Sequence, residues 1–302
     1  MRSRQARQGF SVTAGYTCFS RACAQCEEGQ LHGPDDLARI FLPAFARGIL
    51  RVPALRRFFV SRIAPPGIYE YVLARTKLLD EHFVRALENG VPQIVVLGAG
   101  MDTRALRFAG RNRGVAVFEL DLPATQGPKR EILARKGVPL PEGLVFVSID
   151  FNRENLSDVL SSAGFRADRT SLFLWEGVTM YLEEAAIDAT LGFLRDTAAG
   201  TRVVFDYVYG SVLRGERRYY GEAAIHRRVA KAGEGWTFGI EEGEIERFLS
   251  DRGFCLDEHH APADLEREYL TADDGRVVGR INGTHAIAVA SVDRTTHASP
   301  TV

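Results

Sequence analysis

The sequence predicts an α/β fold built on a doubly wound, mainly parallel sheet, and three observations support this class. From residue 93 onward, strand-like apolar runs alternate with helical patterns, as in parallel strands joined by crossover helices. The first run, residues 93–98, is apolar enough for a strand buried on both faces and ends in a turn containing Gly98 and Gly100. A carboxylate, Asp121, closes the second run, 23 positions after Gly98.

The chain before the first strand reads as mostly helical. The predicted helices are residues 11–25, 34–49, 51–63 and 69–88. Breaks between them fall at Gly33, Pro53 and the Pro65-Pro66-Gly67 sequence. Because no strand separates these helices, we expect them to cover the ligand edge of the sheet. We therefore divide the chain into an N-terminal helical cap, residues 1–90, and a core, residues 91–302.

Seven strands are expected in the core. They are residues 93–98, 115–120, 144–149, 171–176, 201–206, 253–259 and 284–290. The longest interruption, residues 207–240, follows the carboxyl end of the fifth strand and is rich in arginine and tyrosine. Ligands bind at that edge of such sheets, so this insertion is predicted to be a substrate lid. The alternative is an amphipathic helical pair with a solvated arginine face.

The turn after the first strand indicates the kind of ligand. Asp102 or Thr103 can cap the following helix. Thr103 stands where a dinucleotide-binding turn has its third glycine, which favours a nucleoside that carries no pyrophosphate. Asp121 is at the position from which a carboxylate accepts hydrogen bonds from ribose hydroxyls. Glu119, two positions earlier, is its competitor for that role.

Composition and charge exclude several classes of protein. With 45% apolar residues, 25% charged residues and a formal net charge of −1, the chain reads as a globular protein with no electrostatic reason to bind nucleic acid or an anionic membrane. No apolar run reaches the length of a membrane span, and no secretion signal is recognisable, so a cytoplasmic location is expected. No sequence feature indicates an oligomeric state.

The cysteines do not predict a metal site. Cys18, Cys23 and Cys26 match by spacing the start of a plant-type iron–sulfur sequence, but they lie in a helical pattern without a glycine-rich loop. The one further cysteine, Cys255, is far away along the chain. We interpret the spacing as coincidence and expect neither a metal nor a disulfide.

Three motifs in order carry a resemblance to a known family. They are Leu-Gly-Ala-Gly-Met-Asp-Thr-Arg at 97–104, Phe-Glu-Leu-Asp-Leu-Pro at 118–123, and Leu-Trp-Glu-Gly-Val-Thr-Met-Tyr-Leu at 174–182. From about Thr13 to Val292 the chain resembles the class I S-adenosylmethionine-dependent O-methyltransferases related to leucine carboxyl methyltransferase, particularly their bacterial, polyketide-tailoring branch. The resemblance implies a Rossmann-like seven-stranded sheet whose last strand is antiparallel. It also implies S-adenosyl-L-methionine as methyl donor and S-adenosyl-L-homocysteine as product.

The resemblance assigns the nucleoside end of the donor site. Gly98 and Gly100 would let the backbone approach the donor closely, and Asp121 aligns with the family's ribose-binding carboxylate. Asp150 and Phe151 match the pair that holds adenine, through the carboxylate and the following backbone N–H group. Phe151 replaces the family's leucine, which is harmless if the contact is made by the main chain. Alternatively, Asp150 simply caps a helix starting near residues 152–154.

Three charged residues are expected at the methionine end. Arg75 resembles the arginine that pairs with the donor's carboxylate, a role that suits a planar guanidinium. Arg21 lies near a second basic donor contact of the family, and a solvent-facing helix arginine is the plain alternative for such residues. Glu176, at the end of the fourth strand, could meet the methionyl ammonium or the sulfonium, or could be a buried helix cap.

The acceptor is less defined. A carboxylate acceptor is already nucleophilic, whereas a phenol gains from a general base. His226, in the predicted lid, and Tyr181, after the fourth strand, are the candidate substrate contacts. For His259, His260 and His285 we favour a structural role, since no further metal ligands accompany them.

The function that these features favour is O-methylation of a small molecule, such as a polyketide-type secondary metabolite, at a carboxylate or phenol oxygen. A carboxyl methyltransferase acting on a protein C-terminus is one alternative, and a nucleoside-binding protein without catalysis is another. A nicotinamide-dependent reductase would require a glycine at position 103 and a Tyr-x-x-x-Lys or similar proton donor, and the sequence has neither.

Overall fold

A single twisted sheet of seven strands organises the protein. The computed structural model describes residues 12–232 and 235–293. The strands are β1 (Gln93–Leu97), β2 (Ala116–Asp121), β3 (Leu144–Ser148), β4 (Ser171–Trp175), β5 (Arg202–Val208), β6 (Phe254–His260) and β7 (His285–Val292). Their order is β3-β2-β1-β4-β5-β7-β6, and β7 runs antiparallel to both its neighbours. The Rossmann-like sheet with an antiparallel last strand is therefore confirmed, and every strand boundary lies within two residues of its prediction.

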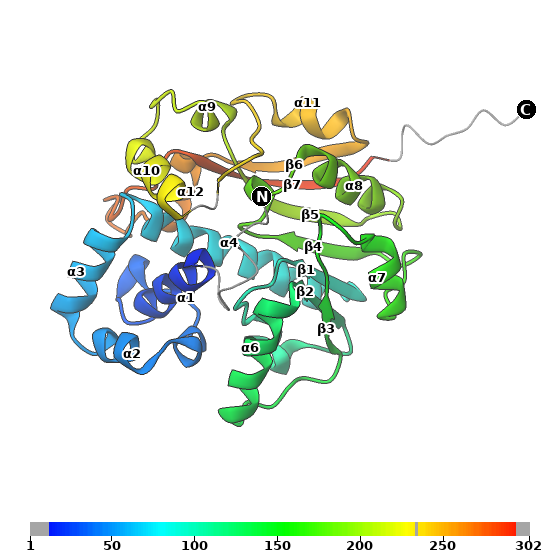
Figure 1. Ribbon diagram of the computed structural model, residues 1–302, viewed down its shortest axis with the longest axis horizontal. Helices are drawn as coiled ribbons and strands as arrows, with labels where there is room; N and C mark the ends of the chain where they lie inside the picture. The colour runs from blue at the N-terminus through cyan, green and yellow to red at the C-terminus, as the bar shows by residue number, and fades with distance from the viewer. Residues whose placement is uncertain (1–11, 233–234, 294–302) are drawn as a thin grey trace, which may run out of the picture.

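Helices cover both faces of the sheet, which divides the apolar core into two layers (Figure 1). Side chains alternate along a buried strand, so Ile94 of β1 belongs to one layer and Val95 to the other. The first layer includes α4 (Ile68–Glu88), α6 (Pro123–Arg135) and α12 (Pro262–Tyr269). The second includes α7 (Leu156–Ser162), α8 (Glu184–Arg195) and α11 (Ile245–Ser250).

The N-terminal helices lie together at one side of the molecule (Figure 1). They are α1 (Val12–Ala24), α2 (Ala44–Leu50) and α3 (Pro53–Ile63), and α4 follows them into the first core layer. Their arrangement agrees with the expected helical segments, with one exception described next. The division into a cap, residues 1–90, and a core, residues 91–302, stays a prediction.

The single helix expected over residues 34–49 is wrong. The segment instead forms a short 3-10 helix, η3 (Ala38–Phe41), followed by α2. The Asp35 carboxylate accepts hydrogen bonds from the N–H groups of Leu37 and Ala38, which tightens the start of the segment. Pro43 then disfavours the helical conformation of the residue before it, so the helix cannot run through.

The start of α4 is fixed to the segment that precedes β7. Gly67 adopts a left-handed backbone with φ of +79°, and its carbonyl accepts the Asn282 N–H at 2.9 Å. A Cβ atom at Gly67 would lie 2.3 Å from the Asn282 nitrogen, so only glycine fits there. The Asn282 side chain also donates to the Pro66 carbonyl at 2.8 Å.

The insertion between β5 and β6 rests on α4. It contains α9 (Gly210–Leu213) and α10 (Glu222–Ala232), and a parallel bridge joins Tyr209 to Ile240. Ile225 of α10 packs with Ile68 and Val72 of α4 in a small apolar cluster. The insertion thus lies over α4, the helix that follows α1, α2 and α3 in the chain. That residues 207–240 move as a lid stays a prediction.

Glu119 does not compete with Asp121 for the role of ribose-binding carboxylate, because the Glu119 side chain points into the first core layer. Its carboxylate pairs with Lys129 of α6 at 2.5 Å, and both side chains are almost completely buried. Burial raises the pKa of Glu119 to about 7, although the neighbouring Lys129 charge opposes the rise. The pair fastens α6 to β2.

Replacing Lys129 by methionine should strongly destabilise the fold. The change leaves a buried carboxylate without its partner, which costs about 3–5 kcal/mol in the free energy of unfolding. Urea denaturation measures this value, and the double variant Lys129→Met/Glu119→Leu should recover most of it. The control is Arg247→Met, which removes an exposed ion pair with Glu244 and should cost less than about 1 kcal/mol. Equal costs for the two single variants would contradict the pairing.

Candidate active site

A large cavity, about 2390 Å³ in volume, opens at the carboxyl ends of β1, β2 and β4. The chain leaves β1 toward β2 on one side, while β4 lies on the other, so this is the point where the strand order reverses. Ligands of open α/β sheets bind in the crevice at such a point. The cavity continues past the sheet edge to residues of α1, α4, α10 and β7. It therefore has an end at the sheet and an end beneath the insertion.

The turn after β1 needs both of its glycines. Gly98 and Gly100 have φ values of +67° and +48°, in the left-handed region. A Cβ atom on Gly98 would lie 2.3 Å from Cγ2 of Val178, whereas one on Gly100 would have no neighbour closer than 3.9 Å. The backbone consequently comes close to the cavity at Gly100, where the space beside the turn is open.

Asp121 holds this turn against the end of β2. One carboxylate oxygen accepts the Gly100 N–H at 2.6 Å, and the other accepts the Leu122 N–H at 2.7 Å. Burial raises the pKa of Asp121, and the two N–H groups oppose the rise. Each carboxylate oxygen has a second lone pair, so Asp121 can still accept hydrogen bonds from a ligand in the cavity that it lines.

Of the two predicted caps for the next helix, Asp102 makes the bond. Its carboxylate accepts the Arg104 N–H at 2.6 Å, at the start of α5 (Arg104–Arg107). The Thr103 hydroxyl accepts a hydrogen bond from the Arg107 side chain instead. The helix is only four residues long, so the cap chiefly orients Arg104 and Arg107 toward the protein interior.

Arg75 and Glu176 meet at the cavity wall. Arg75 of α4 pairs through Nε with Glu176 at 2.9 Å and through Nη1 with Asp206 at 2.5 Å. Arg75 also lines the cavity. Burial alone would raise the pKa of Glu176, but the charges of Arg104 and Arg75 outweigh it and lower the value to about 2. Glu176 is therefore ionised at neutral pH.

These residues belong to a larger buried charge network that runs beneath the cavity. Its members are Arg21, Arg75, Arg104 and Arg107 with Asp35, Asp80, Asp102, Glu176 and Asp206. Arg104 is the centre, since it contacts three of the carboxylates. Four guanidinium groups face five carboxylates, which leaves an excess of one negative charge at the cavity wall. Such a wall favours a cationic ligand.

Arg21 is held in the same network from the cap side. Its Nε pairs with Asp35 at 2.9 Å, and its Nη2 donates to the Met101 carbonyl at 2.6 Å in the turn after β1. Arg21 is buried and lines the cavity, so neither it nor Arg75 is a solvent-facing helix residue. Both arginines are already partly neutralised by protein carboxylates.

Asp150 and Phe151 lie in a turn that follows β3, and both line the cavity. The Asp150 carboxylate accepts the Asn152 N–H at 3.1 Å within this turn. The alternative that Asp150 caps a helix near residues 152–154 is wrong, because α7 begins later and is capped by the Asn155 side chain. The other Asp150 oxygen lies 3.7 Å from Nε of Arg153, an exposed side chain.

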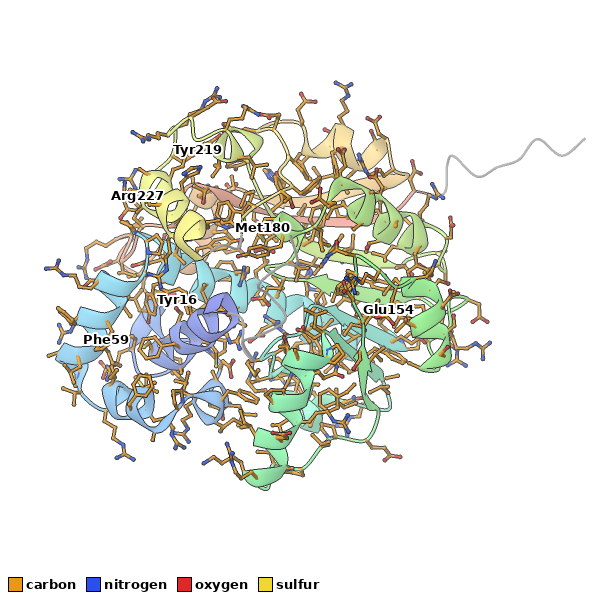
Figure 2. All side chains as sticks on the ribbon, viewed as in Figure 1. Tyr16, Phe59, Glu154, Met180, Tyr219 and Arg227 are labelled. Atoms are coloured by element: carbon orange, nitrogen blue, oxygen red, sulfur yellow. The ribbon has the colours of Figure 1, made fainter. Side chains whose placement is uncertain are left out.

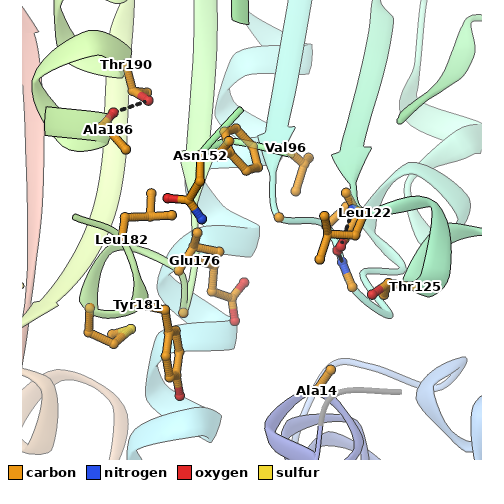
Figure 3. A pocket seen from close by; sticks show the side chains of 18 of the residues that line it. Ala14, Val96, Leu122, Thr125, Asn152, Glu176, Tyr181, Leu182, Ala186 and Thr190 are labelled. Carbon is orange, nitrogen blue, oxygen red and sulfur yellow. Dashed lines mark hydrogen bonds between the residues drawn. The ribbon is translucent and has the colours of Figure 1, made fainter. Parts of the chain in front are cut away.

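The two acceptor-contact candidates have different outcomes. Tyr181, in η5 (Thr179–Tyr181), lines the cavity, and Figure 3 shows Tyr181 and Glu176 pointing into the space that Ala14 of α1 faces. His226 is an exposed residue of α10 outside the cavity lining, with its ring beside Gly215. The α10 residues that line the cavity are Ile225, Arg228 and Val229, and a contact between His226 and substrate stays a prediction.

The side chains of the molecule as a whole agree with this orientation of α10. Figure 2 shows Arg227, the residue after His226, at the periphery of the molecule and Met180 near its centre. Met180 is buried, and Arg227 is exposed. Arg227 is therefore on the solvated side of α10, whereas Arg228 lines the cavity, with its Cζ 5.7 Å from the centre of the Tyr16 ring.

The structure also places a residue in the cavity for which the sequence indicated only a structural role. His285, the first residue of β7, lines the cavity next to Tyr71 and Trp236, at ring-centroid distances of 4.7 and 5.4 Å. The direction of β7 could have indicated that His285 lies at the cavity. Because β7 is antiparallel, its amino end lies at the same edge as the carboxyl ends of the parallel strands.

The fold and the position of the cavity define a class of protein. The structure is similar to that of a methyltransferase from Thermobifida fusca YX, with a TM-score of 0.56 and 16% identity over 92% of this chain and 94% of that one. A DUF574 family protein from Streptomyces avermitilis is similar to the same degree, with a TM-score of 0.56 and 14% identity over 90% and 96%. The fold is thus the Rossmann-like methyltransferase fold.

Sequence comparison identifies the family within that class. The model of the leucine carboxyl methyltransferase family matches residues 15–195, and the chain belongs to this family, whose cofactor is S-adenosylmethionine. YktD of Bacillus subtilis, a protein provisionally named as an S-adenosyl-L-methionine-dependent methyltransferase, is 30% identical over 64% of each chain. A protein of Mycobacteroides abscessus with the same provisional name is 33% identical, also over 64% of each chain. The chain thus matches just under two thirds of the length of these relatives.

Two further observations concern the described residues alone. Within residues 12–232 and 235–293, no helix has both the length and the apolar character needed to cross a membrane. In the same ranges, no three side chains of the metal-ligating types lie close enough together to hold an ion.

Gly98→Ala should destabilise the protein more than Gly100→Ala. Both changes place a Cβ atom on a left-handed backbone, at about 1–2 kcal/mol each, but only the first also collides with Val178. The measurement is the free energy of unfolding in urea. Adding Val178→Ala to Gly98→Ala should bring its cost down to that of Gly100→Ala. Indistinguishable costs for the two alanine variants would mean that the close packing at Gly98 is not maintained.

Proposed function

We propose that this protein is an S-adenosylmethionine-dependent O-methyltransferase that acts on a small molecule. The observation that carries the proposal is the arrangement at the sheet edge. A glycine turn, a carboxylate at the end of β2 and a wall with excess negative charge surround one end of the cavity. A phosphate-free, positively charged nucleoside fits this combination better than a dinucleotide does, because two phosphates would meet carboxylates there.

In this proposal, the nucleoside lies across the ends of β1, β2 and β3. Asp121 accepts hydrogen bonds from the ribose hydroxyls through the lone pairs that Gly100 and Leu122 leave unused. Asp150 accepts from the exocyclic amine of adenine, and the Phe151 N–H donates to a ring nitrogen. The open space at Gly100 lets the backbone contact the donor.

The methionine part would lie against the charge network. Arg75 would pair with the carboxylate of the donor, with Arg21 as a second basic contact, since both arginines line the cavity. The Glu176 carboxylate, ionised at neutral pH, faces the ammonium or the sulfonium. The excess negative charge of the network compensates the positive charge of the sulfonium.

When bound, S-adenosylmethionine supplies an electrophilic methyl group, and the work of the protein is to align the acceptor oxygen with it. The cavity provides a separate place for the acceptor. Beyond Glu176 it is lined by Tyr16, Tyr71 and Trp236 and by the apolar residues of α4 and α10. An aromatic or otherwise apolar small molecule, such as a polyketide-type metabolite, is the kind of acceptor that this lining suits. Tyr181 lies where it can contact the acceptor.

A carboxyl methyltransferase acting on a protein C-terminus is the second candidate. It is favoured by the description of the family, leucine carboxyl methyltransferase, and it would use the same donor residues. The acceptor end distinguishes the two. The side chains of α1, α4 and α10 that surround this end favour a compact molecule over an extended peptide. We further propose that residues 1–90 form the cap and that residues 207–240 act as the lid over this end.

The donor site is tested by ligand-induced stabilisation. At about 100 times its Kd, S-adenosylhomocysteine should stabilise the native state by about 2.7 kcal/mol and raise the melting temperature, whereas NADPH should not. Asp121→Ala should abolish this shift, because the ribose loses its acceptor. Thermal denaturation is measured with and without ligand for each protein. The ligand-induced change in melting temperature is then independent of any loss of stability that the substitution itself causes.

The matched control is Asp168→Ala, which removes an exposed carboxylate outside the cavity. Its shift with S-adenosylhomocysteine should equal that of the unmodified protein. An unchanged shift in Asp121→Ala would remove that residue from the site. Stabilisation by NADPH in place of S-adenosylhomocysteine would contradict the proposed function.

A further inference from the structure

His285 stands at the acceptor end of the cavity in an unusual setting for a buried histidine. Its ring lies against Tyr71 on one side, with the rings inclined by 32°, and meets Trp236 edge to face. Tyr71 in turn lies beneath Arg75, whose Cζ is 5.3 Å from the centre of the tyrosine ring. Since Arg75 pairs with Glu176, these contacts connect His285 directly to the methionine end of the proposed donor site.

The hydrogen bonds around His285 determine which ring nitrogen carries the proton. The Thr284 hydroxyl lies 2.5 Å from Oδ1 of Asn282 and 2.7 Å from Nδ1 of His285. Asn282 donates through Nδ2 to the Pro66 carbonyl, which fixes Oδ1 as the amide oxygen. The single hydroxyl proton of Thr284 must therefore go to Asn282. Thr284 then accepts from His285, so the proton is on Nδ1.

The other nitrogen, Nε2, consequently carries a lone pair. It has no hydrogen-bond partner among the residues that the structure describes, and the residue lines the cavity. Burial, reinforced by the positive charge of Arg75, lowers the pKa of His285 to about 3. The ring is therefore neutral at physiological pH and presents a hydrogen-bond acceptor.

Tight packing keeps this arrangement in place. Asn282 is completely buried, and its backbone N–H donates to the carbonyl of Gly67 at the start of α4. A Cβ atom on Gly221, beside the start of α10, would lie 2.0 Å from Nδ2 of Asn282. Asn282 thus joins β7 to the two helices that enclose the acceptor end. The orientation of the imidazole depends on that junction.

We propose that Nε2 of His285 accepts a hydrogen bond from a hydroxyl group on the methyl acceptor, and that the substrate class is phenols and similar neutral hydroxyl compounds rather than carboxylates. The inference rests on the proposed function and refines it. A carboxylate has only lone pairs to offer and would face another lone pair at Nε2, whereas a phenol offers a proton and keeps an oxygen lone pair for the methyl group. The apolar lining around Ile68, Val72 and Ile225 suits the ring of such a molecule.

The hydrogen bond to Nε2 of His285 also determines where the hydroxyl proton of the acceptor goes. As the acceptor oxygen forms its bond to the methyl carbon, the carbon–sulfur bond breaks and its electrons stay on sulfur. The hydroxyl proton passes to Nε2, because a protonated ether is a far stronger acid than an imidazolium. One positive charge thereby moves from sulfur to His285, and the imidazolium, destabilised by its burial, releases the proton to water in the cavity.

The test is a spectroscopic one on the intact protein with S-adenosylhomocysteine bound. Nitrogen-15 NMR of histidine-labelled protein should show Nε2 of His285 unprotonated, with the resonance assigned by its loss in His285→Phe. Adding 2-naphthol should shift this resonance upfield, and 2-naphthoate should not. A protonated Nε2, no shift with 2-naphthol, or equal shifts with both probes would overturn the proposal.

Turnover gives a second readout with the same probes. The unmodified protein should convert 2-naphthol to its methyl ether, and His285→Phe should lower kcat by at least about 100-fold while leaving the KM for the methyl donor unchanged. The kcat of His285→Gln, which keeps an acceptor oxygen but not a base, should lie between those of the unmodified protein and His285→Phe. The control is His259→Phe, an exposed histidine outside the cavity that contacts Tyr207. Unchanged turnover in His285→Phe, methylation of 2-naphthoate instead, or product from neither probe would overturn the proposal.

Donor binding separates this inference from the function on which it rests. S-adenosylhomocysteine should raise the melting temperature of the unmodified protein and of His285→Phe equally. If it stabilises neither, the proposed function fails. If it stabilises both but Nε2 does not respond to 2-naphthol, the donor site stands and only the role of His285 is wrong.

Discussion

The buried charge network beneath the cavity is the constraint on which the rest of the structure depends. A charge transferred from water to a protein interior costs several kcal/mol unless it is paired, so no member of such a network can be removed without leaving another unpaired. Two of its arginines, Arg21 and Arg75, come from the N-terminal helices, whereas Arg104, Glu176 and Asp206 come from the core. The network therefore fixes the N-terminal helices against the sheet edge with defined geometry.

That geometry gives the cavity two chemically different ends. At the sheet edge, the backbone of the Gly98 turn and the carboxylates of Asp121 and Glu176 form a polar, negatively charged surface. Beneath α10, the lining consists mainly of aromatic and aliphatic side chains, with the guanidinium of Arg228 beside Tyr16. Such a division suits the reaction that we propose, the transfer of a methyl group from a cationic nucleoside to an uncharged ring, because each reactant then has one favourable place. Arg75 stands at the boundary and contacts both ends.

The acceptor end depends on a different interaction, the junction made by Asn282. This one side chain contacts the segments that begin α4 and α10 and lies just ahead of β7. Glycines at positions 67 and 221 allow the three segments to approach one another. The junction also orders the hydrogen bonds that leave Nε2 of His285 as an acceptor. The shape of the acceptor end and the chemistry of its histidine thus have a common structural origin.

The sequence by itself determined the sheet, because the period of apolar residues along a strand is a local property. It likewise identified the glycine turn, Asp121 at the end of β2, and the positions of Arg75 and Glu176, each of which belongs to a short motif. Local sequence patterns did not predict whether a side chain points into the core or toward the cavity. The direction of Glu119 was settled by Lys129, ten residues later in the chain.

Only the tertiary structure decided which histidine reaches the cavity. The sequence favoured His226 as a substrate contact and a structural role for His285, but the rotation of α10 and the antiparallel direction of β7 put the first outside the cavity lining and the second within it. The network around Arg104 is equally a product of folding, since paired residues in it are up to 131 positions apart in the sequence. Pairings between distant residues have no local periodicity, and burial gives them their energetic importance only after the chain has folded.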